Sequence, residues 1–155
     1  MSFKNNFCCI ERRNNFCIIR FVGIPSDVEF QEYLTAIEQL YVDKCCFIAL
    51  FDASKIGNLS LTYIRKQAEF MIKMEDFTRL YMKRVVIIAN PAAKLLLQIL
   101  FKIKTPACDL KVFTHYNNKA KKYLSECPDV QLRTVDAKAI IPDANNKAAP
   151  DGKTQ

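Results

Sequence analysis

Residues 45–52 read Cys-Cys-Phe-Ile-Ala-Leu-Phe-Asp, a continuous apolar run that ends at an acid. A strand that faces water on one side alternates apolar with polar residues, whereas a strand covered on both faces is apolar throughout. Residues 84–89, Arg-Val-Val-Ile-Ile-Ala, show the same lack of alternation. The two runs therefore predict inner strands of a sheet that is covered by helices.

Helical patterns flank these strands. Residues 26–29, Ser-Asp-Val-Glu, have the spacing of a capping box, and apolar residues recur at helical spacing behind them, which predicts a helix over about residues 27–42. Ser60 is the expected cap of a second helix. Asn90-Pro91 begins a third, which ends near Lys102, because Asn is a favoured N-cap and Pro is tolerated at the first helical position.

The remaining elements are short. Residues 7–11 and 16–22 are rich in aromatic and β-branched types and flank the turn-prone residues 12–15, which predicts a β-hairpin. A strand over 110–114 and a small helix over about 117–125 complete the order β-β-α-β-α-β-α-β-α. Because strand–helix–strand crossovers give parallel pairs, we predict an α/β fold with a mixed five-stranded sheet covered by helices.

The chain has 155 residues, which suits one domain. We expect this domain over residues 1–127, followed by a C-terminal extension over 128–155 whose polar end is mobile. No signal-peptide pattern and no long apolar stretch is visible, and the odd number of cysteines, seven, is typical of reduced thiols. A cytoplasmic location is therefore expected.

The net charge of +7 is unevenly distributed, with seven lysines between residues 94 and 122. Such a region could bind nucleic acid or an anionic surface. No arginine is interleaved with these lysines, which argues against a nucleic-acid partner and favours a solvated face.

Catalytic patterns are scarce. His115 is the single histidine, so a nucleophile–base pair would have to use it. The sequence has no Gly-rich phosphate loop, no His-Glu metal motif and no Cys-x-x-Cys spacing. We therefore expect neither enzyme activity nor a metal or other cofactor, although a cysteine nucleophile assisted by His115 stays open as an alternative.

Candidate binding residues lie where the predicted strands end. Ligands of open α/β sheets bind beyond the carboxyl ends of the strands, and helix N-termini offer free amides to anions. The candidate ligand- or anion-binding residues are Asp52, Ser54, Asn58, Ser60 and Asn90. Helix capping and turn formation alone also account for such residues, and this interpretation stays open.

The predicted helix over 91–102 is apolar nearly all round, so something besides the sheet should cover it. Its expected core-facing residues are Leu96, Ile99, Leu100 and Ile103. Three others, expected at an interface with a partner protein or in a homodimer, are Leu95, Leu97 and Phe101. Two alternatives are a cover formed by the C-terminal tail and binding to an anionic membrane or lipid, favoured by the flanking Lys94, Lys102 and Lys104.

The element order and residues 51–57 (Phe-Asp-Ala-Ser-Lys-Ile-Gly) after the central strand resemble the STAS domain, the SpoIIAA-like fold of the anti-sigma-factor antagonists. Residues 85–91 and 110–113 sit where that family has its fourth and fifth strands. The same broad fold also resembles lipid-carrying domains of the Sec14 type.

This resemblance implies a non-enzymatic, regulatory protein-binding module used in signalling, with its switch at the loop and helix start after the third strand. Phosphorylated STAS members carry an Asp-Ser pair at that place. Residues 58–62 of this chain read Asn-Leu-Ser-Leu-Thr and lack the pair.

Overall fold

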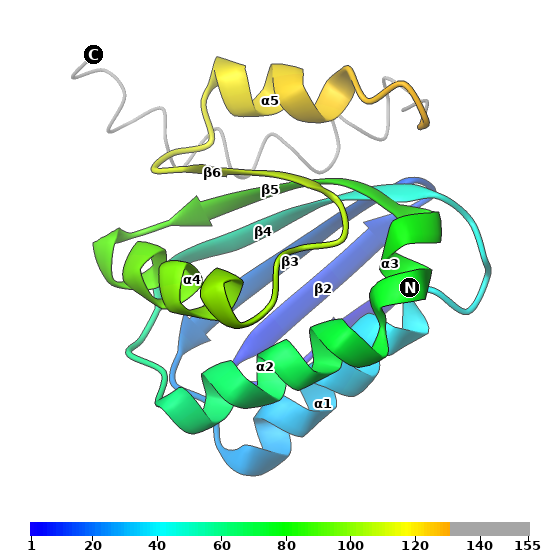
Figure 1. Ribbon diagram of the computed structural model, residues 1–155. Helices are drawn as coiled ribbons and strands as arrows, with labels where there is room; N and C mark the ends of the chain where they lie inside the picture. The colour runs from blue at the N-terminus through cyan, green and yellow to red at the C-terminus, as the bar shows by residue number, and fades with distance from the viewer. Residues whose placement is uncertain (131–155) are drawn as a thin grey trace.

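The structure is a computed structural model that describes residues 1–130 (Figure 1). Most of the predicted C-terminal extension, including its polar end and the tail segment considered as a cover for the third helix, lies outside the described residues.

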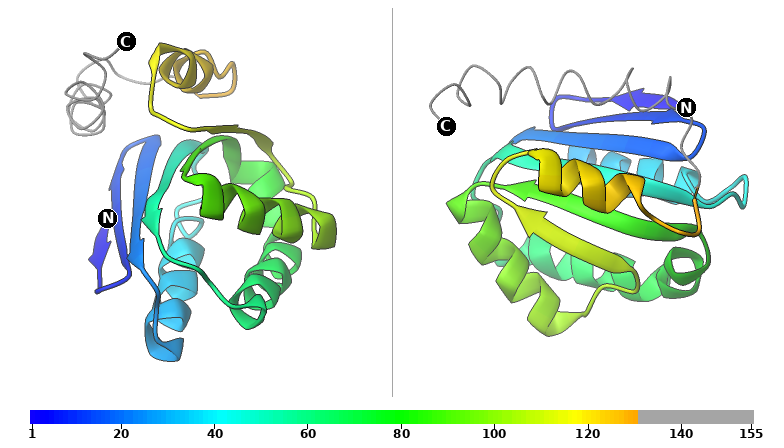
Figure 2. Two further views of the ribbon diagram at one scale, coloured as in Figure 1. Left: turned by 90° about the vertical axis from the view of Figure 1, so that its left-hand side faces the viewer. Right: turned by 90° about the horizontal axis from the view of Figure 1, so that it is seen from above.

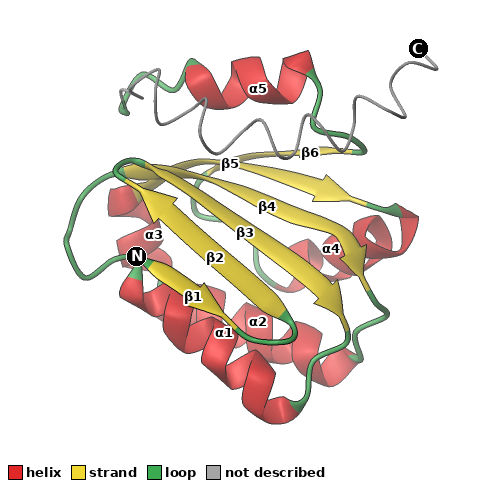
Figure 3. Ribbon diagram, turned by 180° about the vertical axis from the view of Figure 1, so that it is seen from behind, coloured by secondary structure: helices red, strands yellow, loops and turns green. Residues whose placement is uncertain are grey.

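Six strands form one sheet in sequential order. They are β1 (Ser2–Lys4), β2 (Cys8–Arg13), β3 (Phe16–Gly23), β4 (Phe47–Ile56), β5 (Met82–Ala89) and β6 (Asp109–Phe113). β1, β2 and β3 pair antiparallel, whereas β3, β4, β5 and β6 pair parallel, so the predicted mixed α/β sheet is confirmed (Figure 3).

The predicted number of five strands was wrong because β1 was missed. This edge strand pairs with β2 from Ser2–Glu11 to Lys4–Cys9. Three residues are too few to show a periodic pattern, and β1 exists through backbone hydrogen bonding to its neighbour. β4 is also longer than expected and runs to Ile56, so Asp52 pairs with Arg20 and Ile88 inside the sheet instead of following the strand.

The helices are α1 (Asp27–Gln39), α2 (Leu61–Lys73), α3 (Glu75–Tyr81), α4 (Pro91–Ile103) and α5 (Asn118–Ser125). The capping box of α1 is present: Ser26 Oγ accepts from the Glu29 amide at 3.2 Å, and Glu29 Oε1 accepts from the Ser26 amide at 2.9 Å. α3 is separated from α2 at Met74. Phe77 therefore lies on α3 and is exposed.

The helices divide between the two faces of the sheet. α1 to α4 cover one face and α5 covers the other (Figure 2). Neighbouring residues of β4 point to opposite faces: Phe47 and Ala49 belong to the core under α1, α2 and α4, whereas Ile48 and Leu50 belong to the core under α5. This double coverage is why the inner strands lack polar alternation.

Candidate functional site

Two loops at the carboxyl ends of β3 and β4 form one rim. The Gly57 amide donates to the Gly23 carbonyl at 2.8 Å. A Cβ on Gly57 would lie 2.7 Å from Ile24 Cγ1 and 3.3 Å from the Gly23 carbonyl, so a side chain at this position would push Ile24 and the two loops apart. Gly23 itself has φ +69°, in the left-handed region that favours glycine.

The starts of α1 and α2 are tied to the same rim by one tyrosine. The Tyr63 hydroxyl of α2 donates to Asp27 Oδ1 at 2.8 Å and to the Pro25 carbonyl at 3.2 Å. The hydrogen bond to Asp27 raises the pKa of Tyr63, because it stabilises the protonated hydroxyl. The β3–α1 loop, the β4–α2 loop and the two helix starts are therefore held together, and we call this surface the carboxyl rim.

Three of the predicted anion-binding residues are brought together, but their polar atoms bond to one another and to the backbone. Asp52 Oδ1 accepts from the Ser54 amide at 3.0 Å and from Ser54 Oγ at 2.6 Å. Asn90 Oδ1 caps α4 at the Ala93 amide (2.7 Å), and Asn90 Nδ2 donates to the Ser54 and Ile56 carbonyls at 2.9 and 3.4 Å. This network joins the end of β4 to the start of α4.

The other two predicted residues, Asn58 and Ser60, are exposed on the carboxyl rim. Ser60 occupies the N-cap position of α2, but its hydroxyl makes no capping hydrogen bond, so the expected side-chain cap was wrong. Its backbone φ of −69° and ψ of 161° are those of an N-cap, and the hydroxyl remains available to solvent or a partner.

Four apolar residues on the carboxyl rim were not predicted as site residues. Each has more than half of its surface exposed, and they are Val22, Ile24, Val28 and Leu61. They belong to the end of β3, the β3–α1 loop and the first turns of α1 and α2. A weak sequence signal existed, since an apolar residue between Gly23 and Pro25 has no strand or helix to pack against.

The predicted orientation of α4 needs a correction. Leu97 and Phe101, expected at an interface, are half-buried and pack against the core of α1 and the sheet, whereas Ile103, expected in the core, is half exposed. Leu95, the third residue expected at an interface, is exposed. The reason is that α4 packs on α2 as well as on the sheet, and Leu100 is buried against α2 residues. Because of this second contact, the buried side of α4 covers more of the helix surface than predicted and includes Leu97 and Phe101.

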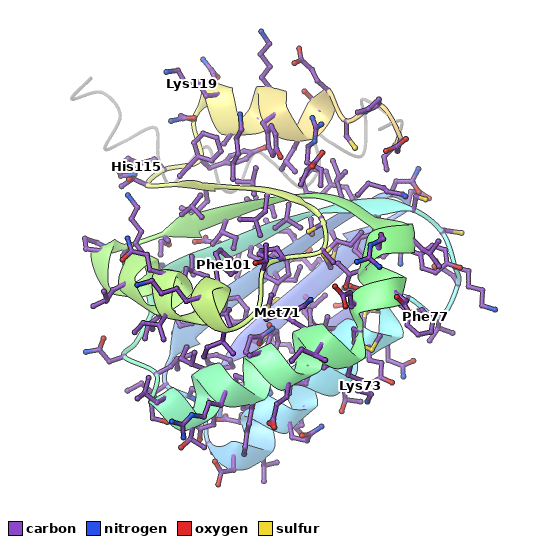
Figure 4. All side chains as sticks on the ribbon, in the orientation of Figure 1. Met71, Lys73, Phe77, Phe101, His115 and Lys119 are labelled. Carbon is purple, nitrogen blue, oxygen red and sulfur yellow. The ribbon has the colours of Figure 1, made fainter. Side chains whose placement is uncertain are left out.

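Leu97 and Phe101 also line a cavity of about 180 Å³ between the sheet and helices α1, α2 and α4. Met71 and Phe101 contribute to its wall from α2 and α4, and Figure 4 labels both. Tyr63, which ties the carboxyl rim together, also contributes to this wall.

The cysteines and His115 are the residues that a cysteine nucleophile with a histidine base would use. Burial raises the pKa of Cys8, Cys17 and Cys108 to about 12, so these thiols stay protonated near neutral pH and are poor nucleophiles. His115 is exposed between β6 and α5 (Figure 4). Within residues 1–130, no group of three or more His, Cys, Asp or Glu side chains is placed to hold a metal ion.

Over the same residues, no helix is both long enough and apolar enough to cross a membrane.

No protein-family model and no curated protein matches the sequence. The fold, by contrast, is similar to solved structures. One is an uncharacterised DUF3478-family protein with a SpoIIAA-like fold from Shewanella loihica PV-4, with a TM-score of 0.54 and 20% identity over 80% of this chain and 98% of that chain. The chain has a STAS-like fold.

A second solved structure with the STAS-like fold is an anti-sigma factor antagonist from Mycobacterium paratuberculosis. Its TM-score is 0.52, with 15% identity over 75% of this chain and 92% of that chain. Both neighbours are covered nearly end to end, so the shared STAS-like fold accounts for almost the whole of each. The low identities mean that the likeness is one of architecture.

Proposed function

We propose that this chain is a non-enzymatic regulatory module that binds a partner protein through its carboxyl rim. The observation that carries the proposal is the group of exposed apolar side chains on that rim, Val22, Ile24, Val28 and Leu61. Exposed apolar groups rimmed by polar residues are typical of interaction sites, and each large side chain buried by a partner contributes about 1.5–3 kcal/mol.

The polar residues of the rim suit the same role. Asn58 and Ser60 lie on the β4–α2 connection and are exposed, and among residues 1–130 neither side chain has a hydrogen-bond partner. The STAS resemblance places the regulatory switch of the family at this connection. One structural neighbour is named an anti-sigma factor antagonist, which supports a protein partner for this chain as well.

Rigidity of the rim also supports a docking role. The Gly57–Gly23 hydrogen bond and the bonds from Tyr63 hold the two loops in one arrangement. A surface that is ordered before binding loses less conformational entropy when the partner docks.

Fewer side chains of α4 are available to a partner than the sequence suggested. Leu95 is exposed and available to a partner or to a second copy of the chain, whereas Leu97 and Phe101 form part of the chain's own interior wall. The homodimer stays a prediction.

The alternative, a membrane- or lipid-binding surface on α4, finds less support. Lys94 Nζ donates to Thr114 Oγ1 at 2.7 Å, and Lys104 Nζ pairs with Glu75 Oε2 at 2.7 Å. Two of the three lysines expected to face anionic lipid are therefore bonded within the domain.

The test is retention of a specific protein by the immobilised full-length chain from the native extract. We expect the rim variant Ile24→Asp, Leu61→Asp to lose that protein. The matched control, Val42→Asp, Leu80→Asp, changes equally exposed apolar residues outside the carboxyl rim and should retain it. Equal loss from both variants, with both folded by circular dichroism, would contradict the proposal.

A further inference from the structure

The wall of the cavity under α1, α2 and α4 is unusually rich in aromatic and sulfur-containing side chains. Six of the 11 Phe, three of the 6 Tyr and three of the 4 Met residues line it. Aromatic rings favour offset or edge-to-face contacts with another ring, and methionine adapts its shape to an irregular guest. This composition suits an aromatic ligand better than a purely aliphatic core would.

Access to the cavity is partly open. Phe51, on the inner strand β4, is only half-buried although helices cover this face of the sheet. Met71 of α2 and Phe101 of α4 are also half-buried, and both belong to the contact between these two helices. Solvent-sized molecules therefore reach the wall without unfolding of the domain.

One polar group in the wall has an unused hydrogen-bond donor. Gln67 Oε1 accepts from the Tyr33 hydroxyl at 3.1 Å. Burial raises the pKa of Tyr33, so this hydroxyl stays protonated and keeps donating. Within residues 1–130, the other amide atom, Gln67 Nε2, has no protein acceptor and is reached by solvent, so a ligand carbonyl or ether oxygen would take the place of water there.

Charge in the wall is already neutralised. Among the described residues, Lys104 is the single charged side chain that lines the cavity, and its Nζ lies 2.7 Å from Glu75 Oε2. A charged ligand would have to leave water without gaining a free counter-charge, which is unfavourable in an apolar site. The wall therefore selects for an uncharged molecule.

We propose that this cavity is a binding site for a small uncharged aromatic molecule whose hydrogen-bond acceptor is recognised by Gln67. The volume of about 180 Å³ suits roughly one substituted benzene ring, since an apolar cavity of about 150 Å³ binds benzene. This site goes beyond the proposed partner-binding function, because the exposed apolar side chains that carry that function, Val22, Ile24, Val28 and Leu61, take no part in the cavity wall.

The first experiment compares three ligands of similar size by NMR titration of the full-length, isotope-labelled protein. Acetophenone has an acceptor, cumene replaces that acceptor with a methyl group, and benzoate carries a charge. We expect saturable shifts at cavity residues with acetophenone and cumene, and no saturable binding of benzoate. Shifts that are scattered over the surface, or that are the same for benzoate, would overturn the proposal.

The second experiment blocks the cavity with a matched pair of substitutions on α4. Leu97→Phe enlarges a wall residue, whereas Leu95→Phe makes the same change at an exposed position that is not part of the wall. We expect Leu97→Phe to weaken acetophenone and cumene binding by about tenfold or more, and Leu95→Phe to bind as the unmodified protein does. Unchanged affinity in a folded Leu97→Phe variant would place the ligand elsewhere.

The third experiment tests the donor and does not depend on blocking the cavity. In Gln67→Met the affinity ratio of acetophenone to cumene should fall about three- to tenfold, the usual effect of losing one neutral hydrogen bond. A general loosening of the site would weaken both ligands equally and leave this ratio unchanged. Because the measurement does not use the blocking variant, it remains informative if Leu97→Phe fails to fold. An unchanged ratio would show that Gln67 does not recognise the acceptor and would overturn its assigned role.

Discussion

The two faces of the sheet pack their helices in different ways, although both are built from the same strands. On the α5 face, Ile48, Leu50 and Val86 have no exposed surface and lie under a single helix that contributes Ala120 and Leu124. On the opposite face, three helices enclose a cavity, and Phe51 of the same strand β4 remains half-buried. One face is a close-packed core, whereas the other has room for a guest.

The difference has an energetic meaning. Side chains that border open space lose the packing contacts that a filled core provides, so the cavity face contributes less stability than a fully packed face would. A ligand bound in the cavity would restore part of these contacts, whereas the α5 face supplies stability that needs no ligand. Four measurements can sharpen or break this comparison.

The largest expected effect comes from the same truncation on each face. Leu50→Ala removes a fully buried side chain under α5 and should lower the free energy of unfolding by about 3–5 kcal/mol. Leu97→Ala removes a half-buried side chain that already borders empty space and should lower it by about 1–2 kcal/mol. Chemical denaturation of both variants measures the two values. Equal losses would mean that the two faces are packed alike.

The second comparison concerns the stability that the N-caps of α4 and α5 contribute. Asn90 caps α4 and also donates to the Ser54 and Ile56 carbonyls, whereas Asn117 caps α5 through the Ala120 amide alone at 3.0 Å. Asn90→Ala should therefore lower the free energy of unfolding by about 2 kcal/mol, and Asn117→Ala by about 1 kcal/mol. Thermal and denaturant unfolding would measure both. The reverse order would contradict the role of Asn90 in joining β4 to α4.

A third comparison removes one tyrosine hydroxyl from each face. Tyr33→Phe loses the bond to Gln67 and should destabilise the protein by about 1 kcal/mol. The buried Tyr116 hydroxyl under α5 has no hydrogen-bond partner among the described residues, so Tyr116→Phe should be neutral or stabilising by up to about 1 kcal/mol. Denaturation at neutral pH distinguishes the two. A clear loss in Tyr116→Phe would reveal a hydrogen bond to that hydroxyl.

The smallest expected effect is the pH dependence of the ion pair beside the cavity. The hydrogen bond and charge of Lys104 lower the pKa of Glu75 below its ordinary value of 4.5. The pair therefore stabilises the fold above that value, and this contribution disappears as the pH falls through the lower, folded-state pKa. In Lys104→Met, denaturation midpoints should fall slightly less between neutral and acidic pH than in the unmodified protein. An identical pH profile would show that the pair adds no measurable stability.

Local sequence patterns determined the elements and their order because each pattern reports on its own segment. The apolar run at 45–51 predicted the strand covered on both faces, and the capping box at Ser26 and the cap at Asn90 predicted two helix starts within a residue. The same patterns carried the STAS resemblance that the fold confirms. Glycines 23 and 57 were visible in the sequence, but not the contact between their loops.

Tertiary structure alone decided what depends on how distant segments meet. β1 exists through pairing with β2, α3 separates from α2 at Met74, and the contact of α4 with α2 turned Leu97 and Phe101 inward. The cavity and the apolar carboxyl rim have the same origin, because both arise from gaps and approaches between elements that are far apart in the chain. The period of a helix shows that it has an apolar side, but only its packing angle determines which of those side chains are buried and where space remains.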